Sequence, residues 1–193
     1  MPRAKTPAPP ALQTKTRPSQ DRAQETFELI LRTAGRLLET MGFEQLSTNL
    51  VCREAGLTPP ALYRYFPNKY AILVELGDRL MKAQDAILVQ AIETRLATDS
   101  VERTTEEKVA ASVAIQNAVI GATRAFPGGV AITRALRAVP MLKEVRLKSR
   151  EEMVEAQTRI YARAYPAIPH DTLVLHTRLC LEMQYAAMEM ALD

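Results

Sequence analysis

A short aromatic and basic run, Tyr63-Arg64-Tyr65, holds the side chains in this 193-residue sequence that are best suited to contact a nucleic acid. An arginine can donate two hydrogen bonds to a guanine or one to a phosphate, and a tyrosine hydroxyl can reach a phosphate oxygen. Ala61 precedes the run and could touch a thymine methyl group. Lys69 begins the next helical segment, where its charge and the helix amino terminus together would attract a phosphate. The alternative is an ordinary solvated helix face whose rings pack on their neighbours.

The run must be positioned by the helices that precede it. From Asp21 onward, apolar residues recur at spacings of three and four, which predicts one amphipathic helix. Gly42 follows the last of them and can adopt the positive φ that closes a helix. The apolar residues of this predicted helix are Phe27, Ile30, Leu31, Ala34, Leu37, Leu38 and Met41.

Two shorter helices are predicted next. Ser47 or Thr48 can cap the first of them, which should run through Glu54 and stop at Gly56. Thr58 can cap the second, whose first turn tolerates Pro59 and Pro60 because its amides have no intrahelical partner, and this helix should reach about Phe66. Its apolar residues, Leu62 and Phe66, lie one turn apart and should face inward. Two short helices joined by a glycine-containing turn predict a helix-turn-helix.

These segments resemble the signature of tetracycline-repressor-type regulators. The resemblance is carried by Gly42-Phe43 and by residues 55–69, which read AGLTPPALYRYFPNK, and it covers about residues 21–73. It implies that the third helix is the recognition helix, that Tyr63 and Lys69 hold the DNA backbone, and that Thr48 and Asn49 add phosphate contacts. The predicted DNA-binding residues are therefore Thr48, Asn49, Thr58, Pro59, Pro60, Ala61, Tyr63, Arg64, Tyr65 and Lys69.

The net charge of +3 is concentrated at the amino terminus. Residues 1–20 contain Arg3, Lys5, Lys15 and Arg17 but no acid, and they are rich in proline. Such a segment cannot bury enough apolar surface to order itself, so we expect a disordered arm that can lie along a polyanion, with a simple solvated tail as the alternative. The predicted division is an arm over 1–20, a DNA-binding domain over 21–68 and a regulatory and dimerisation domain over 69–193.

The rest of the chain also follows a helical pattern. Long helices are predicted over 69–97, 105–125, 141–164 and 170–192, with a short one over 129–139, and prolines separate several of them. The alternation typical of strands does not occur in the sequence. We therefore predict an all-α fold, in which a three-helix helix-turn-helix DNA-binding domain is followed by a helical ligand-binding and dimerisation domain.

Polar residues scattered among apolar ones in the second half are candidates for lining a ligand cavity, although the more common role for each is that of a surface residue or a satisfied core residue. They are Gln84, Gln116, Asn117, Thr123, Arg146, Tyr161, Arg178 and Gln184. The last predicted helix has apolar residues on nearly every side and is the best candidate for a two-fold interface. In the resembling family two carboxy-terminal helices per subunit usually build that interface, and this sequence stops at Asp193 after the first, which leaves open a truncated carboxy terminus.

Other kinds of function are disfavoured by the sequence. Cys52 and Cys180 lie far apart among apolar residues, and His170 and His176 lack the spacing of a metal cluster, so we expect neither a disulfide, nor a metal, nor a cofactor. No motif of an enzyme or of a membrane segment stands out. We expect a soluble, cytoplasmic, ligand-responsive repressor that binds a palindromic DNA operator as a homodimer and is released by a small-molecule effector. The competing hypotheses are a helical adaptor that binds protein and an enzyme with a site in the helical bundle.

Overall fold

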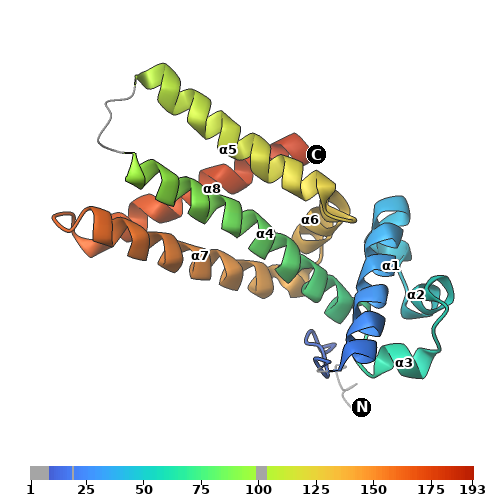
Figure 1. Cartoon of the computed structure of the whole chain (residues 1–193). Coiled ribbons are helices and arrows are strands. Elements are labelled where there is room, and N and C mark those ends of the chain that lie inside the picture. Colours follow the sequence, from blue (N-terminus) through green and yellow to red (C-terminus); the bar gives the residue numbers. More distant parts are fainter. Residues whose placement is uncertain (1–8, 19, 99–103) are drawn as a thin grey trace, which may run out of the picture. The chain divides into compact units, whose positions relative to one another are not determined.

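The computed structural model describes residues 9–18, 20–98 and 104–193, and within them every regular element is a helix. The predicted all-α fold is confirmed. The chain divides into two compact units, Met1–Leu76 and Gly77–Asp193, so the division falls inside the long helix α4 (Lys69–Ala97). Figure 1 shows helices α1 to α3, which belong to the first unit, and helices α5 to α8, which belong to the second.

The first unit consists of α1 (Asp21–Gln45), α2 (Thr48–Ala55), α3 (Pro59–Tyr63) and the beginning of α4. The regular helix of α1 is interrupted at Gly42, which has φ +75°, and α2 ends at Gly56, which has φ +65°. Both glycines adopt the left-handed conformation that a side chain would disfavour, as the sequence predicted. Of the two candidate caps for α2, the structure uses Ser47, whose Oγ accepts a hydrogen bond from the backbone N–H of Leu50 at 3.2 Å.

The core of the first unit is built from the apolar faces of these helices. Its fully enclosed side chains include Ile30, Leu31, Leu38, Val51, Leu62, Phe66, Ile72 and Leu73. Asn68 caps α4, because its Oδ1 accepts a hydrogen bond from the N–H of Ala71 at 3.0 Å. The recapping of the chain after Pro67 is therefore confirmed.

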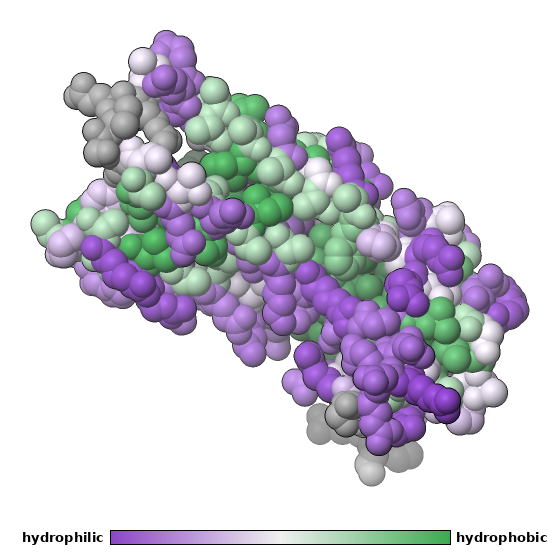
Figure 2. Space-filling model, viewed as in Figure 1, coloured by the Kyte–Doolittle hydropathy of each residue, from purple (hydrophilic) through white to green (hydrophobic). Residues whose placement is uncertain are grey.

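The second unit contains the remainder of α4 with α5 (Thr105–Ala125), α6 (Gly129–Ala138), a 3-10 turn (Pro140–Leu142), α7 (Lys143–Ala164) and α8 (His170–Leu192). Helix α8 packs against α7 and α5. The buried cluster among these helices consists of Leu88, Val119, Met153, Val154, Leu181, Tyr185, Met188 and Leu192. Figure 2 shows apolar residues along α5 on the face of this unit that is turned to the viewer.

No single helix within the described residues has both the length and the apolar composition needed to cross a membrane. Helices α5 and α6 meet that test only when they are taken together, and they are bent by 97° at the break between them.

We expected the arm to be disordered, but in the structure hydrogen bonds hold its residues 9–18 against the first unit. The backbone N–H of Lys15 donates to the carbonyl of Tyr65 at 2.8 Å, and the side-chain amide of Asn68 donates to the carbonyl of Ala11 at 2.8 Å. Arg17 pairs with the buried Glu75 at 3.4 Å. Residues 1–8 and 19 of the predicted arm lie outside the described residues. Gln20, the last residue of the predicted arm, directly precedes α1.

Candidate nucleic-acid interface and ligand cavity

Helix α3 is short because its last residues turn into the core. It contains five residues, and Tyr65 and Phe66 follow it in a turn whose backbone N–H groups both donate to the carbonyl of Leu62. The prediction that the helix extends to about Phe66 was therefore wrong by one turn. Thr58 precedes the helix and accepts through its backbone carbonyl from the N–H of Ala61 at 3.0 Å, but its hydroxyl makes no capping hydrogen bond.

A cluster of aromatic side chains packs the segment that follows α3 against α1. The ring of Phe27 stacks on Phe66 with centroids 4.9 Å apart and meets the edge of Tyr65 at 5.7 Å. All three side chains are buried, and Tyr65 is only 3% exposed. The prediction that Tyr65 points outward with Tyr63 and Arg64 was wrong, because its ring completes this cluster on α1.

The remaining predicted DNA-binding residues around α3 form an exposed surface. Thr58, Pro59, Pro60 and Arg64 are exposed, Tyr63 is 39% exposed, and Ala61 is half-buried at the edge. The guanidinium of Arg64 lies over the ring of Tyr65 at 5.8 Å, so the buried tyrosine supports the exposed arginine. We call Thr58, Pro59, Pro60, Tyr63 and Arg64 the α3 surface.

Helix α2 contributes one neighbour to this surface. The hydroxyls of Thr48 and Tyr63 are 2.9 Å apart, which orients the tyrosine ring from the start of α2. Thr48 is half-buried, whereas Asn49 beside it is exposed. The structure therefore brings these residues to the edge of the α3 surface.

Lys69 has a role within the domain that the sequence did not reveal. Its ammonium donates to the carbonyls of Phe43 at 3.1 Å and Glu44 at 3.2 Å, and it lies 4.4 Å from the centre of the Phe43 ring. The side chain thus ties the start of α4 to the end of α1. A phosphate contact by Lys69 stays a prediction, and two of its three protons are already used in this way.

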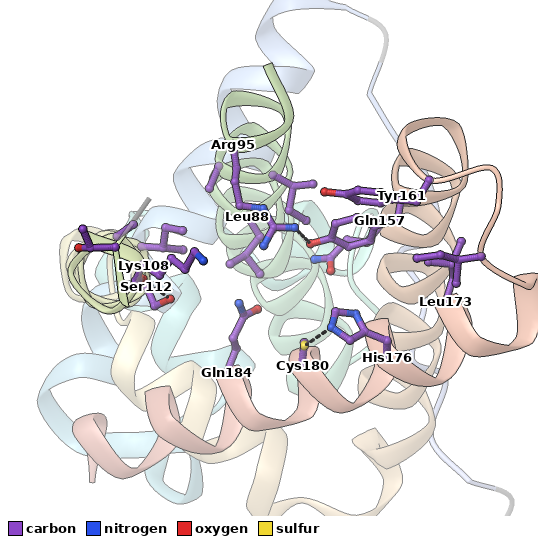
Figure 3. Close-up of a pocket in the computed structure, with 17 residues that line it drawn as sticks. Leu88, Arg95, Lys108, Ser112, Gln157, Tyr161, Leu173, His176, Cys180 and Gln184 are labelled. Atoms are coloured by element: carbon purple, nitrogen blue, oxygen red, sulfur yellow. Dashed lines mark hydrogen bonds between the residues drawn. The ribbon is translucent and has the colours of Figure 1, made fainter. Parts of the chain in front are cut away.

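The second unit contains a cavity of about 980 Å³ between α4, α5, α7 and α8 (Figure 3). Its walls combine aliphatic and aromatic side chains with polar ones. The lining residues are Leu88, Ala91, Ile92, Arg95, Thr104, Lys108, Ala111, Ser112, Ile115, Gln157, Tyr161, Tyr165, Ile168, Leu173, His176, Cys180 and Gln184. Of the predicted ligand-binding residues, Tyr161 and Gln184 lie in this set.

The other predicted ligand-binding residues lie elsewhere. Gln84 donates to Thr123 at 2.8 Å, and both side chains are buried as paired core residues. Gln84 and Arg146 also border a separate space of only about 30 Å³. Gln116 donates to the backbone carbonyl of Gln184 at 3.0 Å. Asn117 and Arg178 are exposed, and Arg178 pairs with Glu151 at 2.6 Å.

Hydrogen bonds and burial set the polar chemistry of the large cavity. Arg95 donates to the hydroxyl of Tyr161 at 3.0 Å, and burial raises the pKa of that hydroxyl, so Tyr161 keeps its proton and can donate it. Gln157 is 4% exposed, and its Nε2 has no hydrogen-bond partner. His176 Nε2 lies 3.7 Å from the sulfur of Cys180. Sequence analysis missed Arg95, Gln157 and His176 because only the packing of four helices brings them together.

A family described as bacterial regulatory proteins, tetR family, matches residues 30–76, which span α1 from Ile30 through the α3 surface to the first part of α4. Residues 30–76 form a tetR-family domain. The resemblance carried by the sequence motif is thereby confirmed for the unit that holds the α3 surface. The tetR-family domain ends at the residue where the first compact unit ends.

Curated relatives of the chain are named as regulators. It is similar to the HTH-type transcriptional regulator EthR of Mycolicibacterium smegmatis, with 41% identity over 78 residues, or 40% of this chain and 35% of that protein. It is also similar to EthR of Mycobacterium tuberculosis, at 37% over 70 residues, covering 36% and 32%. The tetracycline repressor protein class C of Escherichia coli is 39% identical over 54 residues, covering 28% and 25%. The matches span about a third or less of each relative's length.

A solved structure described as a crystal structure of a gamma-butyrolactone receptor (ArpA-like protein) aligns with a TM-score of 0.48 and 20% identity. The alignment covers 86% of this chain and 84% of that one.

Proposed function

We propose that the chain is a transcriptional repressor that binds operator DNA through the α3 surface and is released by a small-molecule effector. The observation that carries this proposal is the exposure of Tyr63 and Arg64 on a short helix that is anchored from beneath by the Phe27, Tyr65 and Phe66 rings. A rigid helix with an exposed arginine fits the major groove of a duplex. The tetR-family domain and the names of its relatives support this use of the surface.

Each exposed side chain has a distinct part in the proposed complex. Arg64 reads a base, because a guanidinium can donate two hydrogen bonds to the O6 and N7 of guanine. Tyr63 and Asn49 bind phosphates and set the register without reading sequence. Thr48 holds the tyrosine hydroxyl in place. Operator DNA lies in the cytoplasm of a bacterial cell, and that is where we place the protein.

The exposed face of α8 supports a homodimer. Leu175, Leu179 and Met183 follow one another at intervals of four residues and are 60%, 55% and 64% exposed, and Met190 is 81% exposed. Large apolar side chains on one helix face are characteristic of an interface. In a homodimer bound to DNA, the two α3 surfaces would enter successive major grooves about 34 Å apart. The operator would then be an imperfect palindrome.

The cavity of the second unit supports control by an effector. Leu88, Ile92 and Arg95 of α4 line it, and the same helix begins at Lys69 in the tetR-family domain. A ligand that binds one position of α4 more tightly than another shifts the population toward that position. We infer that ligand binding moves α4, so that the two recognition helices no longer span the operator. By linkage, ligand and DNA then weaken each other's binding by the same factor.

Selection of bound duplexes from a random pool tests the proposal directly. The purified protein should enrich one imperfect palindrome, and its affinity should fall steeply with added salt because phosphate contacts release counterions. Enrichment of no sequence would contradict the proposal. DNA binding whose affinity does not change with added salt would instead favour a helix-turn-helix that binds another protein.

A further inference from the structure

The cavity between α4, α5, α7 and α8 has an uneven distribution of charge. Arg95 comes from α4 and Lys108 from α5, and both are exposed residues on its lining. None of the described lining residues carries a carboxylate. A cavity that offers cations without acidic partners attracts an anionic ligand. Figure 3 shows both cationic side chains reaching toward the cavity from their separate helices.

The buried side chain of Gln157, on the α7 wall of the cavity, is the second observation. Gln157 is 4% exposed, yet its amide Nε2 has no hydrogen-bond partner. A buried N–H without an acceptor is costly, so native structures rarely leave one unpaired. Gln157 and Tyr161 are one helical turn apart on α7, and Figure 3 shows them on the same side of the cavity near Arg95. A ligand oxygen at this point would accept from Gln157 and from the Tyr161 hydroxyl.

The remainder of the wall is suited to an apolar body. Leu88, Ile115, Ile168 and Leu173 line it together with the Tyr165 ring. The volume of about 980 Å³ lies near the upper end of the usual range for small-molecule sites. Polar side chains, among them Arg95, Lys108 and Gln157, line the rest of the cavity. A wall that is partly apolar and partly polar suits an amphipathic ligand.

We propose that the effector is an amphipathic organic acid. Its carboxylate pairs with Arg95 and Lys108, a second oxygen accepts from Gln157, and its hydrocarbon body lies against Leu88, Ile115 and Leu173. This inference rests on the proposed function, since it names the ligand class of the same regulated cavity.

The test compares acids with their neutral counterparts. Decanoate and 2-naphthoate are titrated calorimetrically into the full chain, beside 1-decanol and 2-naphthalenemethanol. At least one acid should bind about tenfold or more tightly than its alcohol, as expected for a charge-assisted pair in a partly enclosed site. The double variant Arg95→Gln, Lys108→Gln should lose that advantage while still binding the alcohol. The matched control is Lys148→Gln, Arg159→Gln, which removes two charges from the exposed side of α7 and should leave the advantage intact.

Alkylation of Cys180 gives a readout that depends on occupancy of the cavity. Cys180 lines the cavity, whereas Cys52 is 3% exposed in the first unit, so iodoacetamide should label Cys180 first. The acid that binds should slow this labelling in the parent chain and not in the Arg95, Lys108 double variant. Gln157→Leu should weaken the acid further, and circular dichroism of each variant verifies its fold.

Several results would overturn the inference. Equal or tighter binding of both alcohols would assign the cavity to a neutral ligand, and failure of both acids to bind or to protect Cys180 would remove the ligand class altogether. A different result would contradict the proposed function alone. If an acid binds and protects Cys180 but leaves operator affinity unchanged, the ligand class stands and the effector role falls.

Discussion

Asp85 on α4 provides a prediction whose size follows from the structure. The residue is half-buried in the second unit, and the hydroxyl of Tyr185 donates to the Oδ1 of its carboxyl at 3.4 Å. Burial raises the pKa of Asp85 from 3.8 to about 7, against the smaller opposing effect of the Tyr185 hydrogen bond. Asp85→Asn should preserve the shape and the accepted hydrogen bond while removing the charge.

The direction in which stability changes with pH follows from the linkage between protonation and folding. Below pH 3.8 the carboxyl is protonated in both the folded and the unfolded chain, and its contribution to stability is fully present. As the pH rises toward 7, the unfolded chain ionises while the folded chain holds its proton, so stability is lost at about 1.4 kcal/mol per pH unit. The loss is complete above pH 7, where it reaches an upper limit of about 4 kcal/mol.

The assay is urea unfolding of the parent chain and of Asp85→Asn between pH 5 and pH 8, followed by circular dichroism. The stability advantage of the variant should grow by about 2 to 3 kcal/mol across this range, or about 5 to 10 °C in Tm. The matched control is Glu93→Gln, because Glu93 lies on the same helix, is exposed and is not among the groups that shift the pKa of Asp85. An advantage for Asp85→Asn that is the same at pH 5 and pH 8, or that Glu93→Gln reproduces, would refute the reasoning.

The remaining predictions concern the tetR-family domain and the proposed dimer. Tyr65→Phe should leave operator affinity within about twofold, whereas Tyr65→Ala should cost about 3 kcal/mol of unfolding free energy, because the ring is a core residue. Arg64→Ala should lose about 1 to 3 kcal/mol at one base pair in competition binding and relax the preference there. Lys69→Ala should lower the Tm of the domain as well as weaken DNA binding, because its ammonium joins α4 to the carbonyls of Phe43 and Glu44; a normal Tm would contradict this. Leu179→Glu should shift the chain to monomer in analytical ultracentrifugation, and an unchanged mass would move the interface off α8.

Periodicity and helix-ending residues allowed most of the first unit to be predicted. The apolar repeat of α1, the left-handed Gly42 and Gly56 and the cap at Ser47 are local features, and local features depend on few residues. The error at Tyr65 had a different origin. A tyrosine after a short helix is equally compatible with solvent and core, and only the position of Phe27 on α1 decides between them.

The cavity of the second unit could not be predicted in the same way. Its walls come from four helices that are distant in sequence, so Tyr161 and Gln184 were identified while Gln84 and Thr123 were taken for ligand contacts although they pair with each other. Gln157 resembles a surface residue in the polar sequence of α7. Its burial depends on the packing of α7 against α8, which no periodicity of a single helix records.

The most direct test of the central claim is a fluorescence anisotropy titration of the selected operator with the double variant Tyr63→Ala, Arg64→Ala. Both side chains are exposed on the α3 surface, and each phosphate or base contact is worth roughly 1 to 3 kcal/mol, so affinity should fall by about a hundredfold or more while circular dichroism shows that the variant is folded. Arg36→Ala, which removes an exposed charge from α1, serves as the control and should bind nearly as well as the parent chain. If the double variant binds the operator with the affinity of the parent chain, the α3 surface does not bind DNA.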